Sequence, residues 1–169
     1  MTAMPANLSA PVDLMPKEHG AYAILAIPLL TALIVGGLTV AGISTTFAAL
    51  AGFFAHEPLL VMLGKRGPRA QRSTPQAKTR LIVLGSLSIT FGAIAMLTST
   101  REGQIALVGY LLFAAISFAV AWKGQHRSLP GQLWGVLGLS SPAVPVLLVG
   151  GVPLLSVLQI WVIYLLGFL

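Results

Sequence analysis

The stretch that decides the fold is residues 64–98, which read GKRGPRAQRSTPQAKTR and then LIVLGSLSITFGAIAMLT. The second half, Leu81–Thr98, contains no charged residue. At about 1.5 Å per residue, a helix of this length approaches the roughly 30 Å hydrocarbon core of a bilayer. The first half places a cluster of Lys and Arg directly beside it. Cations that flank an uninterrupted apolar run are typical of the cytoplasmic end of a membrane-spanning helix.

The composition of the whole chain agrees with this interpretation. Of 169 residues, 56% are hydrophobic and 8% are charged, with a mean hydropathy of +0.91. A soluble domain carries roughly 25% charged residues, so that class is excluded. The net charge of +6 is too localised for a nucleic-acid partner and suits a membrane lipid surface. The absence of cysteine excludes disulfides, thiolate metal sites and cysteine nucleophiles.

Six stretches are long enough to span a membrane and contain no Lys, Arg or Asp. Their continuous apolar character favours helices over the alternating strands of a membrane barrel. Several connections are very short, which makes consecutive spans antiparallel neighbours. The sequence therefore predicts an all-α, polytopic transmembrane helical bundle, with an N-terminal segment, residues 1–20, and one domain, residues 21–169. The predicted spans are Ala21–Thr39, Ile43–Leu63, Leu81–Thr98, Gln104–Trp122, Leu133–Gly150 and Val152–Leu169.

The distribution of cations predicts the orientation, because Lys and Arg near span ends stay on the cytoplasmic side. Arg101 lies alone on one side of the predicted bundle, and the other nine of the ten cations lie on the opposite side. We therefore expect both termini and the basic loop, residues 64–80, to be cytoplasmic. The nine are Lys17, Lys65, Arg66, Arg69, Arg72, Lys78, Arg80, Lys123 and Arg127.

Small residues spaced four apart suggest where helices come close together. The sequence contains three such pairs, Ala48/Gly52, Ala115/Ala119 and Gly131/Gly135. The pattern does not identify the partner helix of any of them.

Two polar motifs interrupt the apolar helices on the predicted cytoplasmic side. Lys17, Glu18 and His19 lie at the mouth of the first span, where the alternative is an interfacial cap with a snorkelling lysine. His56 and Glu57 lie about 9 Å inside the second span at helical rise. An ionisable group at that depth is a candidate functional residue. The alternative is a structural ion pair of Glu57 with Lys17 or with an arginine of the following loop.

The basic loop offers a site for an anion. Arg66, Arg69 and Arg72 could bind a phosphate bidentately, while neighbouring glycines let backbone amides approach it. His126 adds a further group between the fourth and fifth spans. The alternative is topology determination together with attraction to anionic lipid, worth about 1 kcal/mol per cation near the surface.

Two motifs carry a resemblance to a known family. Lys17-Glu18-His19-Gly20-Ala21-Tyr22, and His56-Glu57-Pro58-Leu59-Leu60 with the basic loop behind it, resemble the YwiC-like family of bacterial membrane proteins. The resemblance runs through the chain from Met15. It implies a multi-pass protein of the bacterial cytoplasmic (inner) membrane and lends no biochemical activity. Family members continue through further helices, so a truncated member is expected.

The plan of the family is similar to that of UbiA-type prenyltransferases, which bind an isoprenyl diphosphate through Asp-rich motifs and Mg²⁺. That similarity would imply Asn-Asp and Asp after the second helix, where this chain has only Glu57, and its single aspartate is Asp13. Glu57 and the distant Glu18 make a poor magnesium-diphosphate site, because Mg²⁺ prefers several oxygen ligands. Mg²⁺ is therefore expected as a cofactor only under the prenyltransferase-type interpretation.

Three functions compete. The first is binding or transport of a small anion, lipid headgroup or proton in a cytoplasmic-side polar pocket. The second is a prenyltransferase-type enzyme that acts on an isoprenyl diphosphate. The third is a structural or assembly subunit whose polar residues only satisfy one another. The candidate pocket residues are Lys17, Glu18, His19, His56, Glu57, Arg66, Arg69, Arg72 and His126.

Overall fold

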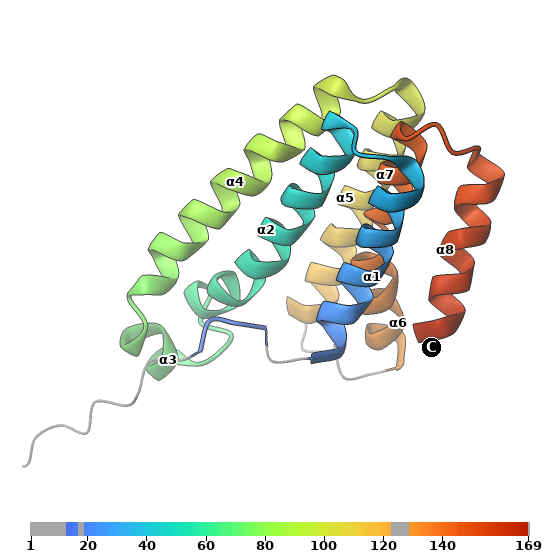
Figure 1. The fold of residues 1–169 in the computed structure, drawn as a ribbon. Helices are drawn as coiled ribbons and strands as arrows, with labels where there is room; N and C mark the ends of the chain where they lie inside the picture. The colour runs from blue at the N-terminus through green and yellow to red at the C-terminus, as the bar shows by residue number, and fades with distance from the viewer. Residues whose placement is uncertain (1–12, 17–18, 123–128, 169) are drawn as a thin grey trace, which may run out of the picture.

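The structure is a computed structural model that describes residues 13–16, 19–122 and 129–168. Within these residues the regular structure is entirely α-helical, which confirms the predicted class (Figure 1). The helices are α1 (His19–Gly36), α2 (Val40–Met62), α3 (Pro68–Ser73), α4 (Gln76–Thr98), α5 (Arg101–Trp122), α6 (Leu129–Ser140), α7 (Ala143–Val149) and α8 (Leu154–Phe168).

Each of the six predicted apolar segments is helical. Within the described residues, four helical stretches are long and apolar enough to cross a membrane, namely Val40–Met62, Gln76–Thr98, Arg101–Ala119 and Gly131–Val149. Two apolar helices are shorter, Gly20–Gly36 and Leu154–Phe168, and the latter's 15 residues span about 22 Å. The chain is therefore a multi-pass membrane protein.

Two predicted segments differ in detail from the observed helices. The fifth consists of α6 and α7, which are separated at Ser141 and Pro142. Proline removes a backbone donor, which interrupts the helical hydrogen bonds at this point. The basic loop contains the short helix α3 and the first turn of α4.

The centre of the bundle is α7, which contacts α1, α2, α5 and α8. Val146 and Leu147 are 0% and 1% exposed, and they pack with Leu25 and Leu29 of α1 in the main hydrophobic core. In Figure 1, α2 and α4 lie side by side at one edge, α8 lies at the other, and α1, α5 and α7 lie between them. A seven-residue helix thus connects the two sides of the bundle.

The pair α2 and α4 shows which small residues mark a helix contact. Ser88 Oγ of α4 donates a hydrogen bond of 2.9 Å to the carbonyl oxygen of Ala48, and it lies against Gly52. The Ala48/Gly52 prediction is therefore confirmed, with α4 as the partner. By contrast, Ala115 and Ala119 are exposed, and a Cβ added at Gly135 would meet nothing within 4 Å. Small size permits close packing but does not create it.

Both ends of the described chain lie at one end of the bundle. The start of α1, helix α3 and the end of α8 are found together there (Figure 1). We call this the basic end, because it carries Lys65, Arg66, Arg69 and Arg72. The opposite end carries Arg101, and the even number of apolar segments accounts for this arrangement.

The closest backbone contact in the core joins the ends of α1 and α7. A Cβ added at Gly150 would collide with the backbone of Gly36, including its carbonyl oxygen. A Cβ added at Gly36 would lie 3.2 Å from the carbonyl oxygen of Val146. The atoms that would clash belong to backbone, so they cannot move aside as a flexible side chain would.

We predict that Gly150→Ala destabilises the fold. The added methyl group overpacks a backbone contact, so we expect the free energy of unfolding to fall by about 1–3 kcal/mol. Thermal unfolding of the purified protein measures this. Gly85→Ala is the control, because its added Cβ meets nothing within 4 Å. Equal thermal stability of the two variants would contradict the proposed contact.

Candidate functional site

The candidate site at the basic end is built around Glu57, which lies in the last two turns of α2 and is 7% exposed. The chain leaves α2 in a Schellman motif. The amide of Lys65 donates to the carbonyl of Leu60 and that of Gly64 donates to Val61, both at 3.0 Å. Gly64 adopts a φ of +70°, a left-handed conformation that glycine tolerates best. This turn directs the next residue, Arg66, back toward α2.

Arg66 forms a two-pronged ion pair with Glu57. Its Nε donates to Oε2 at 3.1 Å, and its Nη2 donates to Oε1. The Arg66 side chain is 41% exposed, whereas that of Glu57 is 9% exposed. A buried carboxylate needs such a partner, because removal from water is costly for an unpaired charge. This is one of the ion pairs that the sequence analysis gave as an alternative, namely Glu57 with an arginine of the following loop.

Glu57 shares a helix face with the aromatic residues that contact the start of α1. Tyr22 packs against Phe53 and Phe54, with ring centroids 5.2 and 6.2 Å apart. Phe53 and Phe54 lie four and three residues before Glu57, a spacing that places side chains on one face of a helix. The Tyr22 hydroxyl donates to the carbonyl oxygen of Pro16 at 3.0 Å. Glu57 therefore faces the region where the chain enters α1.

His56 is directed to a different neighbour. Its ring meets the Phe118 ring of α5 edge-on, with centroids 6.1 Å apart. Phe118 in turn contacts Trp122, and the Lys65 ammonium lies 4.4 Å from the centroid of a Trp122 ring. Adjacent residues of a helix differ by about 100° in direction. His56 thus belongs to a contact between α2 and α5, whereas Glu57 pairs with the loop.

Residues 13–16 form a contact that the sequence did not reveal. Leu14 is buried against Val61 of α2 and Ala77 of α4. Met15 Sδ lies 3.2 Å from an Arg80 Nη2 that donates to it. The segment therefore ties the ends of α2 and α4 together beside the Glu57–Arg66 pair. The only sequence signal for this contact was the pair of apolar residues Leu14 and Met15 just before the charged motif.

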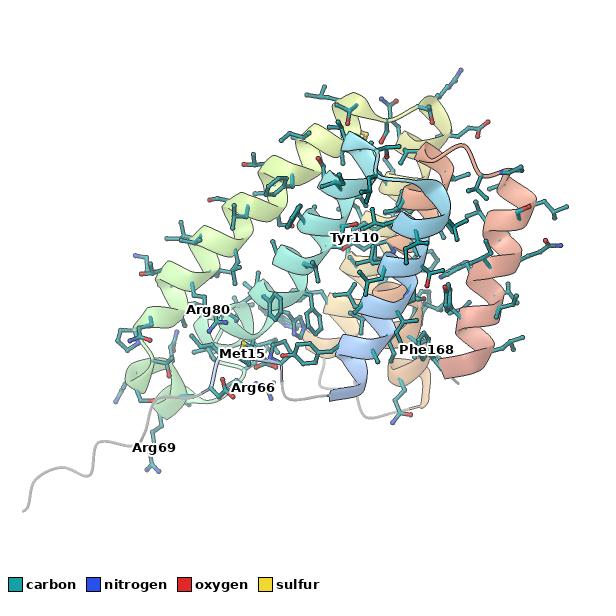
Figure 2. All side chains as sticks on the ribbon, in the orientation of Figure 1. Met15, Arg66, Arg69, Arg80, Tyr110 and Phe168 are labelled. Atoms are coloured by element: carbon teal, nitrogen blue, oxygen red, sulfur yellow. The ribbon has the colours of Figure 1, made fainter. Side chains whose placement is uncertain are left out.

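The other predicted site residues are divided between exposed positions and positions outside the described residues. Arg69 and Arg72 lie on α3 and are exposed, and Arg69 points away from the bundle (Figure 2). His19 begins α1, but its side chain lies outside the described residues. Lys17, Glu18 and His126 also lie outside them. The predicted meeting of Glu18 and His19 with Glu57 therefore stays a prediction.

The donor set does not suit a magnesium-diphosphate site. The part of the chain that the structure describes contains no group of three or more His, Asp or Glu side chains that could hold a metal. Both oxygens of Glu57 accept hydrogen bonds from Arg66. Mg²⁺ prefers several oxygen ligands in octahedral geometry. The described residues thus do not support the prenyltransferase-type interpretation.

Comparison with known proteins identifies the family of this chain. The sequence model of one family, described as YwiC-like protein, matches residues 15–148, which is more than half of the 169 residues. The chain belongs to the YwiC-like family. No curated protein and no solved structure matches it. None of these comparisons matches this YwiC-like protein to a prenyltransferase.

We predict that the Glu57–Arg66 pair stabilises this YwiC-like protein. Arg66→Gln leaves a buried carboxylate without its cation, so the free energy of unfolding should fall by about 1–3 kcal/mol. Arg69→Gln is the matched control, because it removes the same charge from an exposed position of the same segment. Thermal unfolding measures both.

A double variant checks the cause of that loss. Glu57→Gln combined with Arg66→Gln removes the stranded carboxylate and should regain part of the stability lost by Arg66→Gln alone. Identical unfolding temperatures for Arg66→Gln and Arg69→Gln would show that the ion pair contributes nothing.

Proposed function

We propose that this YwiC-like protein is a multi-pass protein of the bacterial inner membrane that binds a phosphate group at its cytoplasmic face. The phosphate is that of a lipid headgroup or of a small soluble phosphate compound. One observation carries the proposal. Arg66 is neutralised by Glu57, whereas Arg69 and Arg72 are exposed and form no ion pair with any residue that the structure describes.

The geometry of α3 suits an anion. Arg69 and Arg72 are three residues apart in one short helix, a spacing that brings two side chains to the same face. Lys65 and Lys78 are exposed on either side of this helix. Planar guanidinium groups bind phosphate oxygens in pairs and with defined direction. The surface of α3 is therefore suited to bind a phosphate group directly, in addition to attracting anions nonspecifically.

The buried pair gives the segment a fixed position. Glu57 holds Arg66, and the Gln71 side-chain amide donates to the Met62 carbonyl oxygen at 2.8 Å. These two contacts attach the segment that carries Arg69 and Arg72 to the end of α2. We assign Glu57 and Arg66 as positioning residues for the anion site. We include Lys17, Glu18, His19, His56 and His126 in the proposed polar region because the sequence places them at this end.

Binding at the exposed arginines is favoured over chemistry at Glu57. A proton carrier or a metal-dependent enzyme would use the Glu57 carboxylate itself, but Arg66 occupies both of its oxygens. Arg69 and Arg72, by contrast, are available without breaking any contact between described residues. The expected attraction to anionic lipid is about 1 kcal/mol per cation near the surface.

We predict that the basic end faces the cytoplasm, and the cysteine-free chain permits a direct test. Single cysteines at the exposed positions Gln76 and Thr100 mark the two ends of α4. In intact cells, a membrane-impermeant maleimide should label Thr100→Cys, and it should label Gln76→Cys only after permeabilisation. The reverse pattern would invert the proposed topology.

We predict that anion binding depends on Arg69 and Arg72. The probes are dihexanoyl phosphatidylglycerol, dihexanoyl phosphatidylcholine and inorganic pyrophosphate, each titrated into purified protein while the unfolding temperature is measured. Phosphatidylglycerol should stabilise the protein more than phosphatidylcholine. Each arginine-to-glutamine change should weaken its binding roughly fivefold, as expected for about 1 kcal/mol per cation. Added salt should reduce the effect.

Arg101→Gln is the control, because it removes one cation from the opposite end of the bundle. Stabilisation by pyrophosphate equal to that by phosphatidylglycerol would identify a soluble phosphate as the ligand. Equal stabilisation by the two lipids, or unchanged binding in Arg69→Gln and Arg72→Gln, would overturn the proposal.

A further inference from the structure

A small cavity lies in the middle of the bundle, away from the exposed arginines of the basic end. It has a volume of about 130 Å³ and is bounded by α5, the start of α7 and α8. Its lining includes Tyr110 and Phe113 of α5 and Trp161 of α8. Tyr110 lies in the middle of the bundle, far from Arg69 at the basic end (Figure 2). The cavity is thus separate from the proposed anion site.

The cavity walls are aromatic and held in place. The rings of Phe113 and Trp161 have centroids 6.0 Å apart at an interplanar angle of 59°. The Trp161 indole N–H donates to Ser140 Oγ at 3.0 Å, and that hydroxyl donates to the Val136 carbonyl at 2.8 Å. Rings fixed in this way present faces and edges that suit another planar ring.

The polar groups near the cavity are satisfied except for one. Ser141 Oγ, which also lines the cavity, donates to the Gly138 carbonyl at 3.0 Å. The Tyr110 hydroxyl forms no hydrogen bond with any residue that the structure describes. Among those residues, no fully buried side-chain nitrogen or oxygen lacks a partner, so this hydroxyl is reached from open space. A phenol in these surroundings is a hydrogen-bond donor without an acceptor.

We infer that this cavity binds the planar six-membered ring of a lipid-soluble carbonyl compound. The ring packs against Phe113 and Trp161, and the Tyr110 hydroxyl donates to the carbonyl oxygen. The cavity volume is close to the roughly 150 Å³ of an apolar cavity that accepts benzene, and this cavity is partly open, so a substituent on the ring can extend out of it. Such a compound reaches the cavity from the bilayer, where it is already dissolved. This inference is independent of the proposed phosphate site.

Two variants test separately the hydrogen bond to the carbonyl group and the binding of the ring. Tyr110→Phe removes only the hydroxyl and keeps the aromatic wall. Gly109→Leu fills the cavity, because Gly109 lines it and a Cβ added there meets nothing within 4 Å. Gly85→Leu is the control for a leucine added at an open glycine position of a different helix, α4.

The experiment compares acetophenone with 2-phenylpropene, which has nearly the same shape and carries a CH2 group in place of the carbonyl oxygen. Each is titrated into purified full-length protein, and the unfolding temperature gives the apparent affinity. In the unaltered protein and in Gly85→Leu, acetophenone should bind more tightly, by roughly threefold to tenfold, as one hydrogen bond predicts. In Tyr110→Phe the two compounds should bind equally. In Gly109→Leu neither should bind.

Other results would overturn the inference. Equal stabilisation of Gly109→Leu and the unaltered protein would show that the compounds act from the bilayer or detergent and not in this cavity. A preference for acetophenone that persists in Tyr110→Phe would remove the role of the hydroxyl. If Gly109→Leu does not fold, Gly109→Ala, which should weaken binding of both compounds, takes its place.

Discussion

A carboxylate buried near the end of an apolar helix must be paired, and the basic end of this protein is arranged around that requirement. Burial of a carboxylate is costly without a cation, and Arg66 supplies two parallel hydrogen bonds to Glu57. To deliver Arg66, the chain must reverse within three residues of the end of α2, which the left-handed glycine at position 64 permits. Arg69 and Arg72 of the same segment stay exposed.

This division gives the cations of one short segment two different roles. Arg66 pairs with the buried Glu57, whereas Arg69 and Arg72 are exposed. Under the proposed function, the same residue type would serve stability at one position and phosphate binding three residues later. The distinction depends on the turn geometry and not on charge, since all three arginines carry the same charge.

The bundle itself depends on close backbone contact around α7. Gly36 and Gly150 bring α1 and α7 together, and Ser88 fits against Ala48 and Gly52 where α4 meets α2. Inside a membrane the hydrophobic effect does not drive helices together, so such contacts and hydrogen bonds have to do so. Where α5, α7 and α8 meet, the aromatic residues Tyr110, Phe113 and Trp161 line a small cavity instead.

Local patterns predicted much of the architecture. Long apolar runs reveal membrane helices because backbone groups in lipid must bond within their own segment. The six apolar segments and the helical class followed from this rule. The sequence also allowed an ion pair between Glu57 and the following loop, because the two are close along the chain. It could not choose between Arg66, Arg69 and Arg72, since the choice depends on the turn at Gly64.

Contacts between distant segments were beyond such patterns. Three small-residue pairs looked alike in the sequence, yet Ala48/Gly52 packs against a neighbouring helix whereas Ala115 and Ala119 are exposed. The packing of Leu14 on Val61 and Ala77, and the cavity beside Tyr110, had no clear sequence signal. The sequence by itself determined which segments are helical, apolar and flanked by charge, because hydropathy and helical period are properties of neighbouring residues. Only the tertiary structure decided which side chains meet, because that depends on the angles and distances between helices far apart in the chain.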